Sequence, residues 1–408
     1  MNMTTRVKLI IMMFLEFFVW GAWYGAIAVY MSANGMKDLT HWAFTGNAIA
    51  AIVSPFFVGL IADRFFATQK VLGVLHLLGA LFMFLAPAFT DTPLVFILLL
   101  IAYNICYMPT LSLANTLAFG QMTDQEKEFP AIRVFGTIGW IASGLIISYG
   151  LSSFVKDISP EATRLPLYLS AAFSLLLGLY SFGLPNTPPP AAGKKVSARA
   201  IIGIDAFRQM GSPSFYVFIL SSFLICIPLA VYYNYTQLYL ASAGFGKIAA
   251  TQVLGQTSEI IFMLIMPLLF RRLGVKWMLG VGMAAWVLRY TLFAAAAPEA
   301  TTWMILTGIA LHGICYDFFF VTGQIYMDKA ANPEIRGQAQ GLIIFITYGI
   351  GMFVGAQIAG VLYNNFLGSN ESLSLEQWQR FWWIPAVFAL GVLLFFITIF
   401  REKATVSK

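Results

Sequence analysis

The sequence predicts an all-α membrane protein of twelve transmembrane helices in two six-helix bundles. Three observations support this fold class: an apolar composition, twelve long apolar stretches, and one polar segment that divides those stretches six and six. Hydrophobic residues make up 59% of the chain and charged residues only 10%, whereas a soluble domain has about 25% charged residues. Most of the chain is therefore expected to contact lipid or other apolar helices.

Each apolar stretch is long enough to cross a hydrocarbon layer of about 30 Å. The first is too long for a signal peptide, and no small-residue cleavage site follows it at the right distance. It is therefore interpreted as a membrane span like the others. The twelve predicted spans cover residues 7–31, 42–62, 70–89, 93–120, 131–152, 165–184, 213–242, 249–270, 276–296, 301–327, 336–365 and 378–400.

The basic residues fall mainly at one side of the predicted spans. With the N-terminus inside the cell, most Lys and Arg residues fall at cytoplasmic ends, while Lys37, Lys156, Arg164, Lys247 and Arg380 fall outside. This asymmetry follows the positive-inside rule and predicts that both termini are cytoplasmic. The net charge of +6 is thus a topology signal, which argues against a nucleic-acid partner.

The longest polar interruption contains a Pro cluster, four basic residues and a short amphipathic stretch. It predicts an N-terminal six-helix bundle at 1–184, a cytoplasmic linker at 185–212 and a C-terminal six-helix bundle at 213–408. Pro-x-Ile-Arg occurs at 130–133 and again at 333–336. The offset between the two copies is near half the chain length, which indicates a duplicated six-helix unit.

Two parallel six-helix repeats are the plan of major facilitator transporters, which bind substrate near the bilayer midplane between the halves. The stretch "GLIADR" at 59–64 resembles the Gly-x-x-x-Asp-Arg loop of that superfamily. This resemblance implies the major facilitator fold for the chain. It also implies that Asp63 and Arg64 latch the cytoplasmic ends of the halves, which is a gating role.

Polar side chains in the spans gather on helices that face the cavity of a major facilitator protein or lie beside it. Such residues more often join membrane helices together than bind a ligand, and that structural alternative stays open for each of them. His76 and Arg289, in other spans, are interpreted as structural residues. The polar and aromatic candidates include Glu16, Trp20, Trp23, Tyr24, Tyr103, Asn104, Tyr107, Thr110, Asn115, Arg133, Thr137, Trp140, Tyr232, Tyr233, Asn234, Gln237, Gln256 and Glu259.

A further pattern lies in the span at 301–327. His312, Tyr316, Phe320 and Gln324 are each four residues apart, so a helix would place them in one stripe. Asp317 lies beside that stripe. A carboxylate at the centre of a membrane helix costs about 2.5–3.5 kcal/mol on insertion scales, so this part of the helix is not expected to face lipid.

Intramembrane carboxylates usually mark an ion or proton path. Burial disfavours the charged form of a carboxyl group, so a proton gradient could load and unload such a group. Asp317, Glu259 and Glu16 are therefore the predicted proton-coupling residues.

Three stretches together resemble the bacterial nucleoside:proton symporters of the major facilitator superfamily. They are "FPAIRVFGTIGW", "GQTSEIIF" and "YDFFFVTGQIYMDK", and the resemblance covers essentially the whole chain. It implies that Arg133 and Thr137 contact the nucleoside, together with Gln256 and Glu259. It also implies a location in the cell inner membrane as a multi-pass protein.

The chain departs from the family pattern near the expected ligand. Characterised members carry a Gln and an Asn in the span where this chain reads "PLAVYYNYTQ", so Asn234 and Gln237 are candidates without a fixed register. His312 stands where a Tyr is expected, and Trp140 and Tyr316 stand where Phe is expected. The predicted substrate-binding set comprises Arg133, Thr137, Trp140, Gln256, Glu259, His312, Tyr316, Asn234, Gln237, Trp20 and Asn104.

The predicted function is proton-coupled import of nucleosides by alternating access. Aromatic faces can stack on a base, and amides and carboxylates can bond ribose hydroxyls or base edges. A proton symporter for another small polar solute, such as a sugar, a glycoside or a peptidoglycan fragment, is the alternative. No catalytic, cofactor or metal motif appears, Cys106, Cys226 and Cys315 lie within apolar spans, and we expect a monomer.

Overall fold

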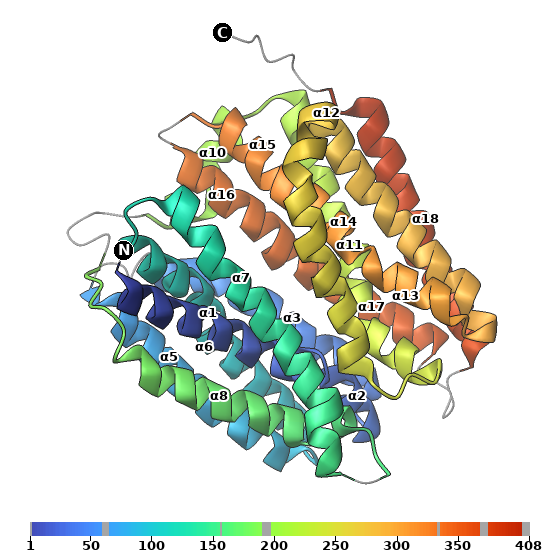
Figure 1. Ribbon diagram of the computed structural model, residues 1–408. Coiled ribbons are helices and arrows are strands. Elements are labelled where there is room, and N and C mark those ends of the chain that lie inside the picture. The colour runs from blue at the N-terminus through green and yellow to red at the C-terminus, as the bar shows by residue number, and fades with distance from the viewer. Residues whose placement is uncertain are drawn as a thin grey trace. The chain divides into compact units, whose positions relative to one another are not determined.

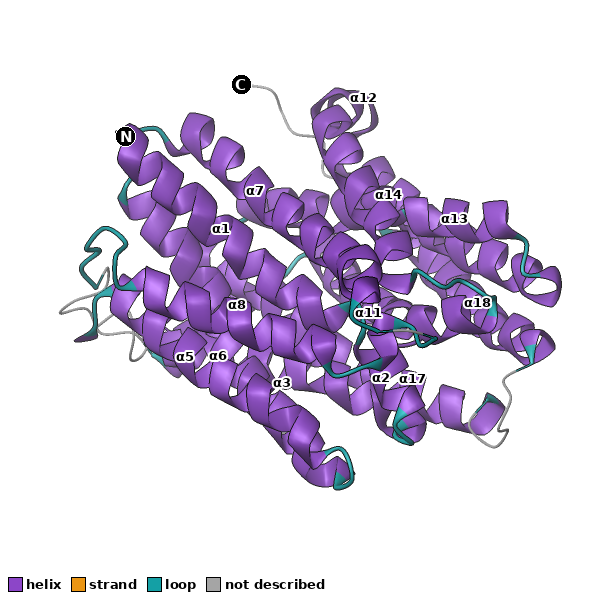
Figure 2. Ribbon diagram, turned by 60° about the horizontal axis from the view of Figure 1, so that its bottom comes forward, coloured by secondary structure: helices purple, strands orange, loops and turns teal. Residues whose placement is uncertain are grey.

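The computed structural model describes residues 2–58, 65–155, 157–189, 197–332, 335–367 and 374–401. Every regular element among these residues is a helix (Figure 2). Each of the twelve predicted spans overlaps one or more of these helices, and residues 59–62 of the second span lie outside the described residues. Nine described segments are long and apolar enough to cross a membrane, one of them being the 52-residue stretch Ile248–Glu299 that contains two predicted spans.

The chain divides into two compact units, which are described separately. The first comprises Met1–Ala198, Asn234–Ala241 and Phe245–Val253, and the second comprises Arg199–Tyr233, Ser242–Gly244 and Leu254–Lys408. The predicted bundles at 1–184 and 213–408 are continuous stretches of sequence, whereas these units combine separate segments, and the predicted boundaries stay a prediction. In these units, the short segments Asn234–Ala241 and Phe245–Val253 group with the N-terminal helices.

The N-terminal helices of the first unit are shown in blue to green in Figure 1. Their bounds are α1 (Met3–Tyr24), α2 (Ile27–Ala33), η1 (Lys37–Leu39), α3 (Thr40–Phe57), α5 (Thr68–Leu85), η3 (Ala86–Phe89), α6 (Pro93–Gly120), α7 (Gln125–Leu145), η4 (Ile146–Gly150), η5 (Leu151–Ser153), η6 (Pro160–Ala162) and α8 (Leu165–Ser181).

The remaining helices follow the linker region. Their bounds are α9 (Ala198–Ile202), α10 (Ile204–Gln209), α11 (Pro213–Ser242), α12 (Ile248–Ala296), η7 (Ala297–Glu299), α13 (Thr302–Ala310), α14 (His312–Tyr316), η8 (Asp317–Val321), α15 (Thr322–Ala330), α16 (Arg336–Ile344), η10 (Phe345–Gly351), α17 (Met352–Phe366) and α18 (Leu375–Ile399). Of these, η8 and η10 are π-helical.

The long helix α12 contains the break expected between its two predicted spans. Gly274 has φ 67° and ψ −178° inside the helix, a region that is essentially restricted to glycine. The sequence places this residue between the apolar stretches at 249–270 and 276–296. The chain therefore changes direction at a position where only glycine avoids strain.

In the first unit, α1 packs against α6, α7 and α8, while α5 packs against α6 and α8. Its core includes Leu9, Met12 and Met13 of α1 with Leu113 and Leu117 of α6, all fully buried. A membrane supplies no hydrophobic drive between helices, so close van der Waals packing must hold them. Small residues at the crossings allow that packing.

The crossing of α1 and α7 shows this most clearly. A Cβ atom added to Gly139 of α7 would collide with the backbone carbonyl of Phe14, and one added to Gly136 would collide with the ring of Phe17. On α1, a Cβ atom at Gly21 would collide with the Ser143 hydroxyl. The backbones of the two helices therefore approach each other closely because these three positions lack a side chain.

We expect Gly139→Ala to destabilise the protein, because the added methyl group meets a carbonyl that cannot rotate away. Overpacking of this kind costs about 1–3 kcal/mol, so the thermal midpoint of the purified protein in detergent should fall. Gly391→Ala is the control, since an added Cβ there has no heavy atom within 4 Å. Equal midpoints for Gly139→Ala and wild type would contradict the close-packing account.

Candidate substrate and proton sites

Four aromatic side chains of the first unit form what we call the aromatic cluster: Trp20 and Tyr24 of α1, Tyr107 of α6 and Trp140 of α7. The ring centre of Trp20 lies 5.2 Å from that of Trp140 and 5.8 Å from that of Tyr107. The Tyr24 and Trp140 centres lie 5.8 Å apart. Trp20 and Trp140 are only half-buried, so part of each indole can stack on a planar ligand.

The two polar candidates of α7 lie one helical turn apart beside this cluster. Arg133 and Thr137 are half-buried and share a helix face, because they are four residues apart. The guanidinium carbon of Arg133 lies 4.0 Å from the ring centre of Phe17 on α1, a cation–π contact. The packing of α1 on α7 therefore places the Arg133 guanidinium against Phe17, the residue that follows Glu16.

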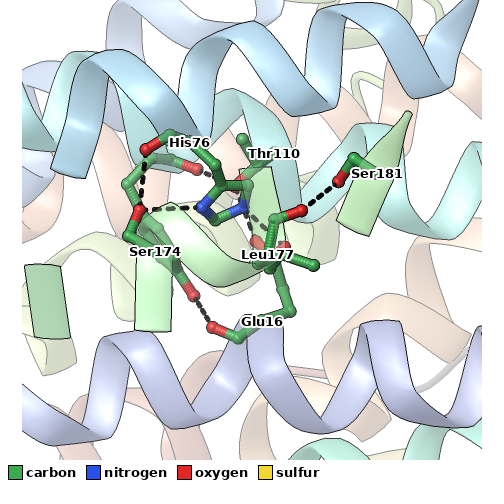
Figure 3. A network of polar contacts seen from close by, with 7 residues as sticks. Glu16, His76, Thr110, Ser174, Leu177 and Ser181 are labelled. Atoms are coloured by element: carbon green, nitrogen blue, oxygen red, sulfur yellow. Dashed lines mark hydrogen bonds and ion pairs between the residues drawn. The ribbon is translucent and has the colours of Figure 1, made fainter. Parts of the chain in front are cut away.

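Glu16 is fully buried and lies in a hydrogen-bonded network inside the first unit (Figure 3). Its Oε2 lies 2.9 Å from Nε2 of His76 on α5, and its Oε1 accepts a 2.6 Å hydrogen bond from the Thr110 hydroxyl on α6. His76 Nδ1 lies 3.1 Å from the hydroxyl oxygen of Ser174 on α8. The sequence interpretation of His76 as a packed residue did not include this carboxylate partner.

Asn104 and Gln237 form hydrogen bonds with the protein's own backbone. Asn104 Nδ2 donates to the Leu100 carbonyl at 2.8 Å within α6. Gln237 accepts from the Ala28 amide at 3.1 Å and donates to the Tyr24 carbonyl at 2.7 Å. Gln237 thus bridges the interruption between α1 and α2, and a ligand-binding role for these two amides stays a prediction.

Asn234 and Gln256 have buried amide atoms without a partner. Neither side-chain polar atom of Asn234 has a hydrogen-bond partner among the described residues, and the same holds for Oε1 of Gln256. A buried unsatisfied polar group costs about 1–3 kcal/mol. A polar ligand or water that bonded these atoms would remove that cost.

In the second unit, three members of the predicted stripe form a row of tilted rings in contact. The centres of His312 and Tyr316 lie 5.8 Å apart, and those of Tyr316 and Phe320 lie 5.2 Å apart. The fourth member, Gln324, is exposed. The π-helical turn η8 explains this difference, because its i→i+5 bonding accommodates one more residue than an α-helical turn and shifts the register beyond it.

His312 is buried and stacks on Tyr232 of α11 with ring centres 5.8 Å apart. Its Nε2 lies 4.0 Å from Oε2 of Glu259 on α12. The two helices are joined beside this contact, where the Gly313 amide donates to the Ser258 hydroxyl at 3.0 Å. The structure therefore brings together the predicted residues Glu259, His312 and Tyr316 within one unit.

Asp317 is fully buried, and neither of its carboxylate oxygens has a hydrogen-bond partner among the described residues. An ionised carboxylate that is buried without a hydrogen-bond partner is very unfavourable. This environment favours the neutral, protonated side chain.

Arg289 is a charged residue whose place near this site the sequence did not indicate. It is fully buried on α12, donates from Nε to the Gly308 carbonyl at 3.0 Å, and lies 4.1 Å from the ring centre of Tyr232. Its other two guanidinium nitrogens have no hydrogen-bond partner among the described residues. The sequence feature that could have pointed to this position is the occurrence of an Arg within an apolar span.

The predicted gating residues Asp63 and Arg64 lie outside the described residues. The other predicted site residues fall into two groups. Glu16, Trp20, Asn104, Arg133, Thr137, Trp140, Asn234 and Gln237 belong to the first unit, and Gln256, Glu259, His312, Tyr316 and Asp317 belong to the second.

Comparison with known proteins gives consistent matches over the whole chain. The chain is 41% identical to the protein named "Putative nucleoside transporter YegT" of Escherichia coli (strain K12), over 98% of this chain and 95% of that protein. It is 28% identical to the nucleoside permease NupG of the same strain, over 98% and 97% of the two proteins.

Solved structures agree with these relatives. A crystal structure of the nucleoside transporter NupG superimposes with a TM-score of 0.84 at 27% identity, covering 99% of this chain and 100% of that one. A D-xylose-proton symporter shares the fold alone, at a TM-score of 0.73 and 13% identity. The predicted major facilitator fold is therefore confirmed.

The model of one protein family, described as "Nucleoside H+ symporter", matches residues 3–405. This match confirms the resemblance predicted from the three sequence stretches. The chain belongs to the nucleoside H+ symporter family.

Proposed function

We propose that this protein imports nucleosides together with protons by alternating access. Family membership supports the reaction class, and the single structural observation that carries the proposal is the state of Asp317. A carboxyl group that is buried without a hydrogen-bond partner among the described residues binds a proton readily. The proton can leave only when water or a cation reaches the group, which links its release to a change in conformation.

The ligand contacts proposed for the first unit combine stacking and charge. Trp20 and Trp140 are half-buried, and an indole ring can stack on a flat base. Arg133 and Thr137 lie on the same face of α7 as Trp140 and supply hydrogen-bond donors. Asn234 supplies an amide whose polar atoms have no partner among the described residues.

The contacts proposed for the second unit are mostly acceptors and hydroxyl groups. Glu259 is partly exposed, at 19% of its side chain, and can accept hydrogen bonds from ribose hydroxyls. Gln256 has a carbonyl oxygen without a partner among the described residues. The imidazole of His312 and the hydroxyl of Tyr316 can bond to base edges.

The placement of the protein in the cell follows from the same family and from its charge pattern. We propose a multi-pass protein of the cell inner membrane with both termini cytoplasmic, acting as a monomer. The excess of Lys and Arg at one side of the spans supports this orientation. The protein is proposed to act as a transporter and not as an enzyme, with nucleosides and protons as its only small-molecule partners.

Counterflow in proteoliposomes tests the substrate class. Vesicles loaded with unlabelled uridine or adenosine should transiently take up the same nucleoside in labelled form. Vesicles loaded with an unlabelled sugar, glycoside or peptidoglycan fragment should not take up that solute in labelled form. Counterflow with one of those solutes and none with any nucleoside would favour the alternative of another small polar substrate.

We expect Glu259→Gln to weaken nucleoside binding without preventing folding. A hydrogen bond to a charged group contributes about 1.5–3 kcal/mol, so the dissociation constant should rise roughly tenfold to a hundredfold. Equilibrium binding to the purified variant measures this. Glu376→Gln, the same change at an exposed side chain, should bind like wild type, and unaltered affinity in Glu259→Gln would exclude the proposed contact.

We expect Asp317→Asn to separate exchange from accumulation. An Asn side chain is neutral like the protonated acid, so the variant should retain counterflow but lose accumulation driven by a pH gradient. Asp91→Asn, at an exposed position, should retain both activities. Equal loss of counterflow and of gradient-driven uptake in Asp317→Asn would assign this carboxyl group a structural role.

A further inference from the structure

The contact between Glu16 and His76 is a buried pair of titratable groups that the mechanism above does not use. Both side chains are almost completely buried, at 0% and 1% exposure, and Oε2 and Nε2 lie 2.9 Å apart. The pair lies within the first unit and links α1 to α5. Its neighbours decide how many hydrogens it holds.

Ser174 fixes which ring nitrogen of His76 carries a hydrogen. The Ser174 hydroxyl has one hydrogen, which it donates to the His76 carbonyl at 2.9 Å, because a carbonyl oxygen can only accept. The same hydroxyl oxygen lies 3.1 Å from Nδ1. We assign the hydroxyl hydrogen to the carbonyl, so that the hydroxyl oxygen accepts from Nδ1 and Nδ1 is an N–H donor.

With Nδ1 protonated, the contact to Glu16 requires one more hydrogen. Neutral imidazole would present the lone pair of Nε2 to a carboxylate oxygen, and two acceptors do not approach to 2.9 Å. A hydrogen must lie between them, either on Nε2 of an imidazolium or on a protonated carboxyl group. In both arrangements the pair has bound one proton and carries no net charge.

Loss of that proton would leave a net negative charge in an apolar interior. The Thr110 hydroxyl shares its one hydrogen between the other oxygen of Glu16 and the Tyr107 carbonyl, while the imidazole would present a lone pair to the carboxylate. Ionisable groups on the neighbouring helices interact with Glu16 directly or through one another: the hydroxyls of Tyr103 and Tyr107 on α6 interact with Glu16, the Cys106 thiol on α6 interacts with Tyr103, and Arg133 on α7 interacts with Tyr107. Arg133 is the cation among them, and it lies beside Phe17.

A short chain of contacts joins the pair to the aromatic cluster. The Tyr107 hydroxyl donates to the backbone carbonyl of Glu16 at 2.7 Å. The ring of Tyr107 lies 5.9 Å from the His76 ring and 5.8 Å from that of Trp20. A change in the pair therefore acts on the side chains proposed to stack on the base.

We propose that the Glu16–His76 pair is a second proton-binding site, which takes up one transported proton and releases it during each cycle. The proton enters the contact between Nε2 and Oε2 from one side of the membrane and leaves to the other, returning the pair to a carboxylate and a neutral imidazole. This inference rests on the proposed proton-coupled transport. It adds one coupled proton to that of Asp317.

The limiting accumulation ratio of the nucleoside tests the proposal. With the membrane potential held at zero, this ratio depends on the number of coupled protons and not on the transport rate. Glu16→Gln should retain counterflow, since the Gln amide can donate to Nε2 as the protonated acid does. At a gradient of one pH unit, the loss of one coupled proton should lower the limiting ratio about tenfold.

The matched control is Glu161→Gln. Glu161 is equally buried but accepts from the Ser148 and Ser159 hydroxyls and the Ala249 amide, not from an imidazole. Its limiting ratio should equal that of wild type even if the rate falls. A wild-type ratio in Glu16→Gln would overturn the proposal and make the pair structural.

A second measurement does not depend on the transport activity of any variant. The chain has three histidines, so ¹⁵N-histidine NMR of the purified wild-type protein should resolve His76, assigned by loss of its signal in His76→Gln. Nδ1 should carry a hydrogen, and Nε2 should shift with pH over the range in which uptake is coupled. An Nδ1 without hydrogen, or an invariant Nε2, would overturn the proposal. Absence of wild-type counterflow would instead contradict the proposed function, and the NMR result would still stand.

Discussion

The free-energy cost of an ionised carboxylate in an apolar interior governs the chemistry of both units. Moving an isolated charge into such surroundings is so unfavourable that the group takes up a proton or finds a partner. The protein shows both solutions. Asp317 has no hydrogen-bond partner among the described residues, while Glu16 has an imidazole and a hydroxyl group. In both cases, whether the carboxyl group holds a proton depends on the conformation around it.

The two groups differ in what releases the proton. For Asp317, the proposed release requires access of water or a cation, since no donor in the described part of the chain bonds to the carboxylate. For Glu16, release requires that the imidazole turn away or that a positive charge approach, because the existing contact already contains the hydrogen. A transporter with both kinds of group can bind protons under different conditions in its two units.

Most of the fold could be predicted from the sequence, because the length and polarity of each span are dictated by the bilayer. The interruption at Gly274 and the bounds of α6 and α11 match their predicted spans. The site was less predictable. Spacing placed His312, Tyr316 and Phe320 in one row, but the π-helical turn η8 moved Gln324 out of it. A periodicity argument assumes an unbroken α-helix and cannot detect an added residue in one turn.

Contacts between side chains of different helices also could not be predicted from the sequence. His76 and Glu16 are 60 residues apart, and Arg289 stacks on Tyr232 of another helix, so neither contact follows from local spacing. Gln237 looked like a ligand amide because it is polar and intramembrane. Its bonds to Tyr24 and Ala28 arise from an interruption between α1 and α2 that the apolar pattern at 7–31 does not reveal.

The glycines at the crossing of α1 and α7 have a mechanical consequence. Because Gly21, Gly136 and Gly139 bring the two backbones into close contact, neither helix can slide or tilt far without displacing the other. Glu16 and Trp20 lie one turn apart on α1, and Arg133 and Trp140 lie on α7. If Glu16 binds a transported proton as proposed, a tilt of α1 on loss of that proton would move all four side chains together, without a chain of side-chain rearrangements.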